Sequence, residues 1–159
     1  MTAKSFPRTF TNPKIWIFAL MVMIFPHFAM AGLGGDASSV VNDSVHLKGA
    51  LRITQTQSFA VHEIRMPAGT VVREFVSPTG KVFGVAWEGP FVPDMQQLMG
   101  SYFEQFQNAA ARVTPTGRRV LSINEPGLVV QAGGHMRSYV GRAYVPGLMP
   151  AGVTAESIK

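Results

Sequence analysis

The chain has 159 residues, no cysteine and a formal net charge of +5. Without cysteine it can form neither a disulfide nor a thiolate metal site, so packing alone has to stabilise it. Three of the positive charges lie within the first 14 residues, and most of the remaining arginines are scattered along the chain. A scattered distribution makes nucleic acid a poor candidate partner, because phosphate-binding proteins cluster their basic residues.

Residues 1–31 have the order of a secretory signal peptide. Three basic residues precede an apolar run over residues 15–25, and Ala29-Met30-Ala31 follows it. Small residues at Ala29 and Ala31 fit a cleavage site directly after Ala31. The alternative is a membrane anchor, but an anchor needs about 20 apolar residues. We therefore expect an exported protein with no permanent membrane anchor after cleavage.

The rest of the chain is long enough for one hydrophobic core, so we expect a single domain over residues 32–146. Its start, residues 32–36, is rich in glycine and is predicted to be flexible. A short helix is predicted over residues 38–48, where a serine can cap its start and a glycine can end it. Residues 147–159 are predicted to be a flexible tail.

Period-two alternation with many β-branched residues predicts four strands between residues 51 and 88. Turn residues separate them, including Pro67-Ala68-Gly69 and Ser77-Pro78-Thr79-Gly80. Three further strands are predicted after the long helix described next, with a glycine turn at residues 132–134. The predicted strands cover residues 51–56, 59–66, 70–77, 81–88, 118–123, 127–131 and 136–145.

One long amphipathic helix is predicted over residues 93–112, because apolar residues recur there at spacings of three and four. Asp94 suits the start of the helix and Arg112 its end. Gly100 lies inside it, which suggests close packing against a strand. Strands that precede and follow a single helix indicate an α+β protein, in which a curved antiparallel sheet packs on that helix.

No motif in the sequence identifies an enzyme. His62-Glu63 begins like a zinc-protease motif, but Met66 stands where the second histidine belongs. Ser101 has no adjacent elbow motif, and His46 and His135 lie in other segments than His62. We therefore expect no metal site and no cofactor.

A small hydrolase or lyase is the enzymatic alternative. Its site would have to combine side chains at one end of the sheet, drawn from Arg73, Glu74, His62 and Glu88. This hypothesis requires a carboxylate and a histidine within hydrogen-bond reach in one pocket. Alternation along the strand places Glu74 with the apolar Val72 and Val76, and Arg73 on the other face.

Three motifs together carry a family resemblance: VREFVSP at residues 72–78, VFGVAWEGP at residues 82–90 and PDMQQLMGSY at residues 93–102. The chain resembles a bacterial exported family, domain of unknown function number 2844, over residues 33–113. Met99 departs from the pattern, which has a second leucine there. The resemblance implies a small protein of the Gram-negative periplasm and brings no activity, substrate or catalytic residue.

The sequence therefore favours a non-catalytic binding or accessory module of the cell envelope, whose partner would be a periplasmic or envelope protein. The segment between the sheet and the helix is rich in aromatic residues, so Trp87, Phe91 and Asp94 are the candidate partner contacts. Trp87 and Phe91 could equally be core residues. A carrier of a small apolar ligand is another alternative, and it would require a cavity between helix and sheet.

Overall fold

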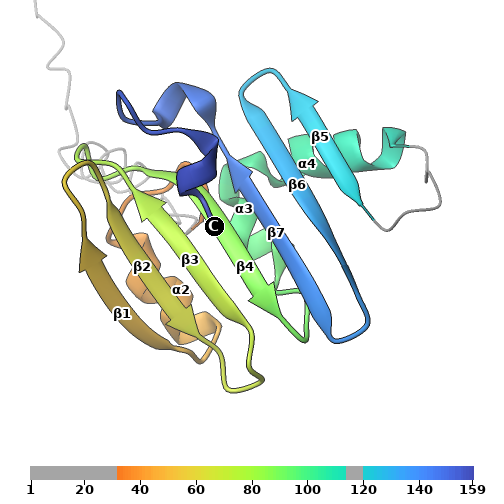
Figure 1. Ribbon diagram of the computed structural model, residues 1–159, viewed down its shortest axis with the longest axis horizontal. Helices are drawn as coiled ribbons and strands as arrows, with labels where there is room; N and C mark the ends of the chain where they lie inside the picture. Colours follow the sequence, from red (N-terminus) through yellow and green to blue (C-terminus); the bar gives the residue numbers. More distant parts are fainter. Residues whose placement is uncertain (1–31, 114–119) are drawn as a thin grey trace, which may run out of the picture.

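The computed structural model describes residues 32–113 and 120–159, so the predicted leader and its cleavage site at Ala29 and Ala31 lie outside the described residues. Seven antiparallel strands form one open sheet in the order β1-β2-β3-β4-β7-β6-β5 (Figure 1), which makes the protein α+β. The strands are β1 Ala50–Gln55, β2 Ala60–Arg65, β3 Val71–Val76, β4 Val82–Gly89, β5 Leu121–Glu125, β6 Leu128–His135 and β7 Ser138–Tyr144.

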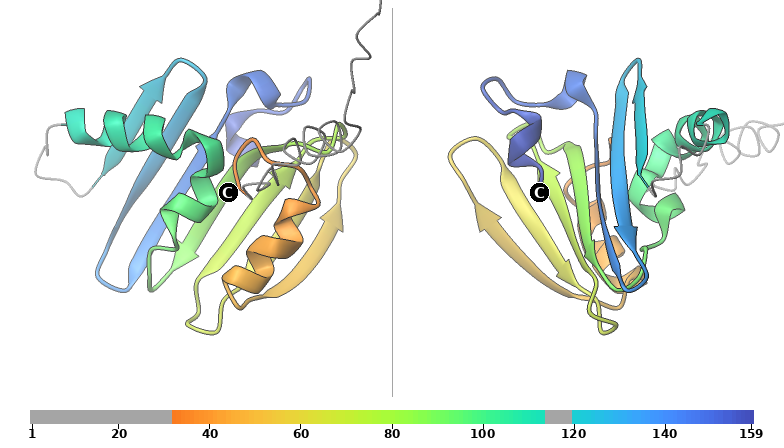
Figure 2. Two further views of the ribbon diagram at one scale, coloured as in Figure 1. Left: turned by 180° about the vertical axis from the view of Figure 1, so that it is seen from behind. Right: turned by 45° about the vertical axis from the view of Figure 1, so that its right-hand side comes forward.

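All the α-helices of the described chain pack on one face of this sheet (Figure 2). The helix α2, Ser39–His46, covers the half that contains β1 to β3, and α3, Met95–Met99, and α4, Phe103–Arg112, cover the other half. The predicted short helix is thus present. None of the helices in the described part of the chain has the length and apolar character needed to cross a membrane.

The predicted helical segment at residues 93–112 is present, but Gly100 divides it. A 3₁₀ turn, Gly100–Tyr102, separates α3 from α4. Gly100 has φ +51° and ψ −126°, a backbone conformation that favours glycine. Asp94 caps α3 as predicted, since its carboxylate accepts hydrogen bonds from Gln96 N at 2.9 Å and Gln97 N at 3.2 Å.

The glycines near the end of the chain lie within the sheet. Residues 132–134 were predicted to form a turn, but they belong to β6, and the hairpin turn is at Met136 and Arg137. The prediction was wrong because glycine is needed here for close approach to β7: a Cβ atom on Gly134 would lie 2.1 Å from the carbonyl oxygen of Ser138. A Cβ atom on Gly141 would lie 2.2 Å from the indole ring of Trp87, so β7 needs glycine where that ring packs.

The segment before α2 is packed rather than flexible. Leu33 is fully buried, and its backbone N–H donates to the carbonyl of Leu98 at 2.9 Å. Asp36 pairs with Lys81 in an isolated β-bridge, and its carboxylate lies 2.7 Å from Lys81 Nζ. The expectation of a flexible glycine-rich start was therefore wrong, because one buried leucine anchors the segment.

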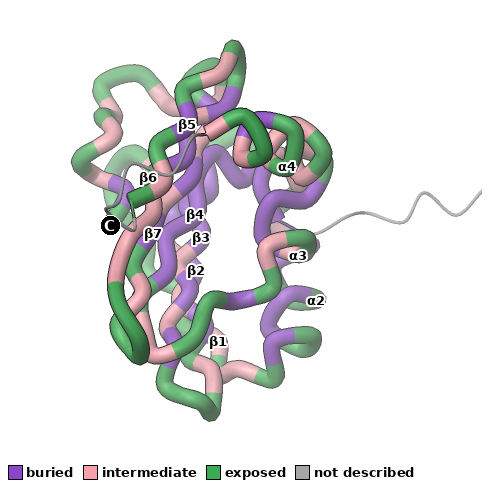
Figure 3. Tube along the Cα trace, turned by 90° about the vertical axis from the view of Figure 1, so that its right-hand side faces the viewer, coloured by how far each residue is buried: buried purple, intermediate pink, exposed green. Residues whose placement is uncertain are grey.

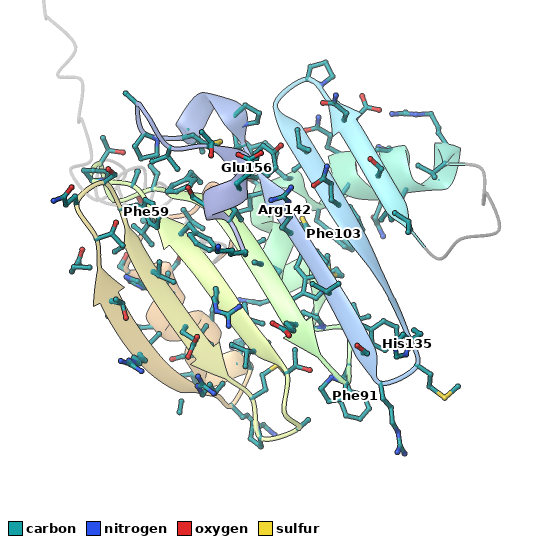
Figure 4. The ribbon with its side chains drawn as sticks, viewed as in Figure 1. Phe59, Phe91, Phe103, His135, Arg142 and Glu156 are labelled. Carbon is teal, nitrogen blue, oxygen red and sulfur yellow. The ribbon has the colours of Figure 1, made fainter. Side chains whose placement is uncertain are left out.

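The predicted tail at residues 147–159 is also packed, against the face of the sheet that carries no α-helix (Figure 2). It contains part of the 3₁₀ turn Pro146–Leu148 and a second one, Ala155–Ser157. Ile158 is fully buried, in a hollow that Gly84 leaves open. Arg142 donates from Nη1 to the carbonyl of Ala155 at 2.6 Å (Figure 4), which fixes the segment to β7.

Two apolar clusters result, one on each face of the sheet. The larger lies between the sheet and the helices, where the inward sides of α2 and α3 are buried (Figure 3). The smaller lies beneath the C-terminal segment and contains Phe75, Phe83, Ala86 and Ile158. Phe59 packs edge-on against Phe83, with a distance of 5.8 Å between ring centroids.

Candidate functional site

An apolar pocket of about 400 Å³ lies where α3 and α4 face β4, β7 and β6. Small residues create it: Ala110 on α4 faces Ala132, Gly133 and Gly134 on β6, and larger side chains at these positions would fill the space. Apart from backbone groups and the Tyr139 hydroxyl, the lining is apolar. It includes Trp87, Met95, Phe106, Val113, Leu121 and Val130.

The pocket opens onto exposed apolar side chains. Val92, Val120 and Val140 line it and are 51%, 61% and 55% exposed; we refer to these three valines as the apolar rim. The rim reaches round to the other face of the sheet, because Val140 is the register partner of Glu88, and Val120 and Val140 also line a second pocket there. Phe91, the neighbour of Val92, is also exposed and lies at the same end of the sheet as the β6–β7 turn (Figure 4). Apolar surface that continues from a cavity onto the outside is typical of a binding site.

The three predicted partner contacts have different surroundings. Trp87 is only 3% exposed, and its ring forms part of the pocket wall, so it is mainly a core residue. Asp94 is the cap of α3. Phe91 is exposed, and its backbone is fixed because Thr70 Oγ1 donates to the Phe91 carbonyl at 2.9 Å. Of the three, only Phe91 offers a large apolar side chain to a partner.

The four residues of the hydrolase hypothesis do not form one site. His62 and Glu74 lie on the helix-covered face, where both are buried. Arg73 lies on the opposite face, where its Nε is 3.1 Å from Glu63 Oε2 and its Nη1 is 4.0 Å from Glu88 Oε2. Because the sheet separates the two pairs, the combination of all four in one active site is wrong.

The structure adds a residue that the sequence analysis missed. Asp43, on the buried side of α2, is 1% exposed and lies beside the fully buried Glu74. Burial raises the pKa of both carboxyl groups, and the neighbouring Asp43 charge raises the pKa of Glu74 further, well above its usual range. The burial of Asp43 could have been predicted from the sequence, because its helical spacing from Val40 and Leu47 places it on the apolar side of α2.

The histidines are not brought together. His46 lies on α2, His62 is buried on β2, and His135 ends β6. Within residues 32–113 and 120–159, no three histidine, aspartate or glutamate side chains are grouped so that they could hold a metal ion.

These observations define an α+β protein with an open seven-stranded sheet, helices on one face, and an apolar pocket between the two. The chain belongs to the family described as protein of unknown function (DUF2844), whose model matches residues 29–158. The match includes the packed C-terminal segment as well as the motifs at residues 72–102. Neither the curated proteins nor the solved structures contain a match to the chain.

Proposed function

We propose that this is an exported, periplasmic protein of a Gram-negative bacterium and that it acts as a non-catalytic binding module for a periplasmic or envelope protein. The observation that carries the proposal is the apolar pocket together with its rim. An apolar side chain of the partner would enter the pocket, and the partner's surface would cover Val92, Val120 and Val140. Covering these valines removes apolar area from water, which favours association.

The described lining of the pocket supports a role without catalysis. Among the described residues that line it there is no histidine, carboxylate, lysine, arginine, serine or threonine, and hence no obvious general base or nucleophile. The predicted leader supports export, and the family match begins at residue 29, close to the predicted cleavage site.

A second candidate function is a carrier of a small apolar ligand. The volume of the pocket favours it, since about 400 Å³ lies within the range of roughly 300 to 1,000 Å³ that is usual for small-molecule sites. The exposed rim favours a protein partner instead, because a small ligand inside the pocket would leave these valines in water.

Site-specific photocrosslinking in living cells tests the proposed function. A photoreactive residue at Val140 should give a discrete protein adduct, and Ala110→Phe, which fills the pocket, should reduce its yield. Val45, which is 69% exposed on α2, is the matched control position. Identical adducts from positions 140 and 45, or no adduct at position 140, would contradict the proposal.

The carrier can be distinguished with the purified mature protein, in which Trp87 is the only tryptophan if residues 1–31 are removed. Energy transfer from Trp87 to an anilinonaphthalene probe reports occupation of the pocket. In a carrier, Val140→Lys leaves saturable probe binding intact and Ala110→Phe removes it. In a protein-binding module, Val140→Lys removes the adduct that a photoreactive residue at Val120 forms with the partner.

Export has its own test. N-terminal sequencing of the native protein from a periplasmic extract should give a sequence that begins at Gly32. A product that begins at Met1 would contradict the proposed location and leave the pocket to be explained in another compartment.

A further inference from the structure

A buried acidic cluster connects α2 to the rest of the fold. The carboxyl groups of Asp43 on α2 and Glu74 on β3 are neighbours in the interior, where Asp43 Oδ2 and both oxygens of Glu74 have no hydrogen-bond partner. Asp43 accepts a hydrogen bond from the side-chain amide of Gln97 on α3, and its carboxyl group lies close to the backbone of Gly32. The contacts of one aspartate therefore join α2, the sheet, α3 and the N-terminal segment.

The surroundings of the pair require a proton between the two acids. If both were ionised, Asp43 Oδ2 and both oxygens of Glu74 would be buried acceptors with no donor. No lysine or arginine in the described chain forms an ion pair with either group. Two adjacent carboxylates without a cation or donor are strongly destabilised in an apolar interior, whereas one shared proton makes them a hydrogen-bonded pair.

The other titratable groups nearby are two histidines. His62 on β2 is the register partner of Glu74, and burial lowers the pKa of its ring, which favours the neutral form. His46 on α2 attracts the charge of Asp43, but only weakly compared with the effect of burial. Neither histidine therefore replaces the proton that the acids share.

We propose that Asp43 and Glu74 form an acid latch, in which one shared proton holds α2 against the sheet and its loss to water releases this helix. In the closed latch, one carboxylic acid hydrogen-bonds to one carboxylate. In the released state, both groups are hydrated carboxylates and the proton is in solution. The linings of the apolar pocket and of two further pockets do not include Asp43 or Glu74, and the proposed role of the latch is to control the conformation of α2.

The direction of the pH dependence follows from the raised pKa values. The folded state holds the proton more tightly than the released state, so the latch is closed at acid pH. It weakens as the pH rises from the ordinary carboxyl range through the raised folded-state pKa. Within that window each pH unit increases the opening constant of α2 by up to about tenfold.

Hydrogen exchange of the α2 backbone amides, corrected for the intrinsic pH dependence of exchange, measures this opening in the mature protein. The wild type should open more readily as the pH rises from 5 to 8. Glu74→Gln should remove this dependence, because its amide donates to the Asp43 carboxylate at every pH. Glu63→Gln is the matched control, since Glu63 lies on the opposite face of the sheet and its pKa is lowered, not raised.

His62→Gln separates the histidine from the latch. Its buried ring contributes in the opposite sense, towards opening at acid pH, so this variant should keep the alkaline opening. A carboxyl carbon titration of the wild type by NMR reads the Glu74 pKa directly and does not require any variant to fold. A normal Glu74 titration, or the same alkaline opening in Glu74→Gln, would overturn the latch.

Discussion

The two halves of the helix-covered face solve the same packing problem differently. Under α2 the interface contains two buried carboxyl groups and a buried histidine. Under α3 and α4 it is apolar, but small residues on α4 and β6 leave a pocket. Buried polar groups demand particular partners, whereas an unfilled apolar interface can accept a ligand. The comparison therefore fits the two proposals, a conformational role for the α2 half and a binding role for the α3–α4 half.

The largest effect is expected from Trp87→Ala in the apolar half. Loss of this buried indole should lower the free energy of unfolding by about 3–5 kcal/mol, and equally at pH 5 and pH 8 because no titratable group is removed. Chemical denaturation at both pH values measures it. Phe91→Ala, at an exposed position, should change the stability far less. If the loss of unfolding free energy in Trp87→Ala differed between pH 5 and pH 8, the proposed distinction between the two halves would be wrong.

The next effect is expected from Gly141→Ala, at the contact of β7 with the Trp87 ring. A Cβ atom 2.2 Å from the indole forces the ring or the strand to move, which should cost about 1–3 kcal/mol. Gly147→Ala is the matched control, because nothing lies within 4 Å of a Cβ atom there. If both substitutions lower the thermal unfolding temperature equally, the packing of the Trp87 ring is not the reason why β7 has a glycine at position 141.

A smaller effect is expected from Arg142→Ala, which acts on the opposite face. The guanidinium group fixes the C-terminal segment to β7. Ile158 of this segment packs on Phe75 of β3 and Phe83 of β4, so the segment bridges the two halves of the sheet. Removal of the guanidinium group should cost about 1 kcal/mol and make residues 146–158 more accessible to limited proteolysis. Arg52→Ala on the edge strand β1 is the control. Unchanged cleavage in Arg142→Ala would show that Ile158 alone holds the segment.

The smallest change in stability is expected from Ala110→Leu. The added methyl groups enter existing space, so the free energy of unfolding should change by less than about 1 kcal/mol. Binding of the anilinonaphthalene probe should nevertheless decrease, because the pocket becomes smaller. A large loss of stability would mean that α4 and β6 are already closely packed at this point.

The sequence predicted the elements whose signals are local. Alternation located β1 to β4, and Asp94 marked the start of α3. The prediction failed where a contact with a distant part of the chain determines the structure. Residues 32–36 and 147–159 have a composition typical of flexible segments, but Leu33 and Ile158 are buried. Glycines predicted to form a turn belong to β6, whose partner strand β7 lies beside the Trp87 ring. The family match with residues 29–158 could be anticipated from the three motifs.

The candidate site was only partly predictable. Trp87 was predicted to lie in the segment between the sheet and the helix but belongs to β4, where it lines the apolar pocket, whereas Phe91 lies in that segment, next to the pocket residue Val92. The pocket itself depends on Ala110 facing β6, a pairing that no local pattern specifies. Alternation already placed Glu74 and Arg73 on opposite faces. The approach of Asp43 to Glu74 depends on how α2 docks, which the sequence pattern alone could not specify.

The burial of Ile158 affects the timing of folding. Its contacts with Phe75 and Phe83 close the cluster on the face without α-helices. A nascent chain that has not yet reached residue 158 leaves these two aromatic rings uncovered, even when every strand has been synthesised. The final native packing therefore has to wait until residue 158 has been synthesised, and a product truncated before this isoleucine would expose an apolar surface to chaperones and proteases.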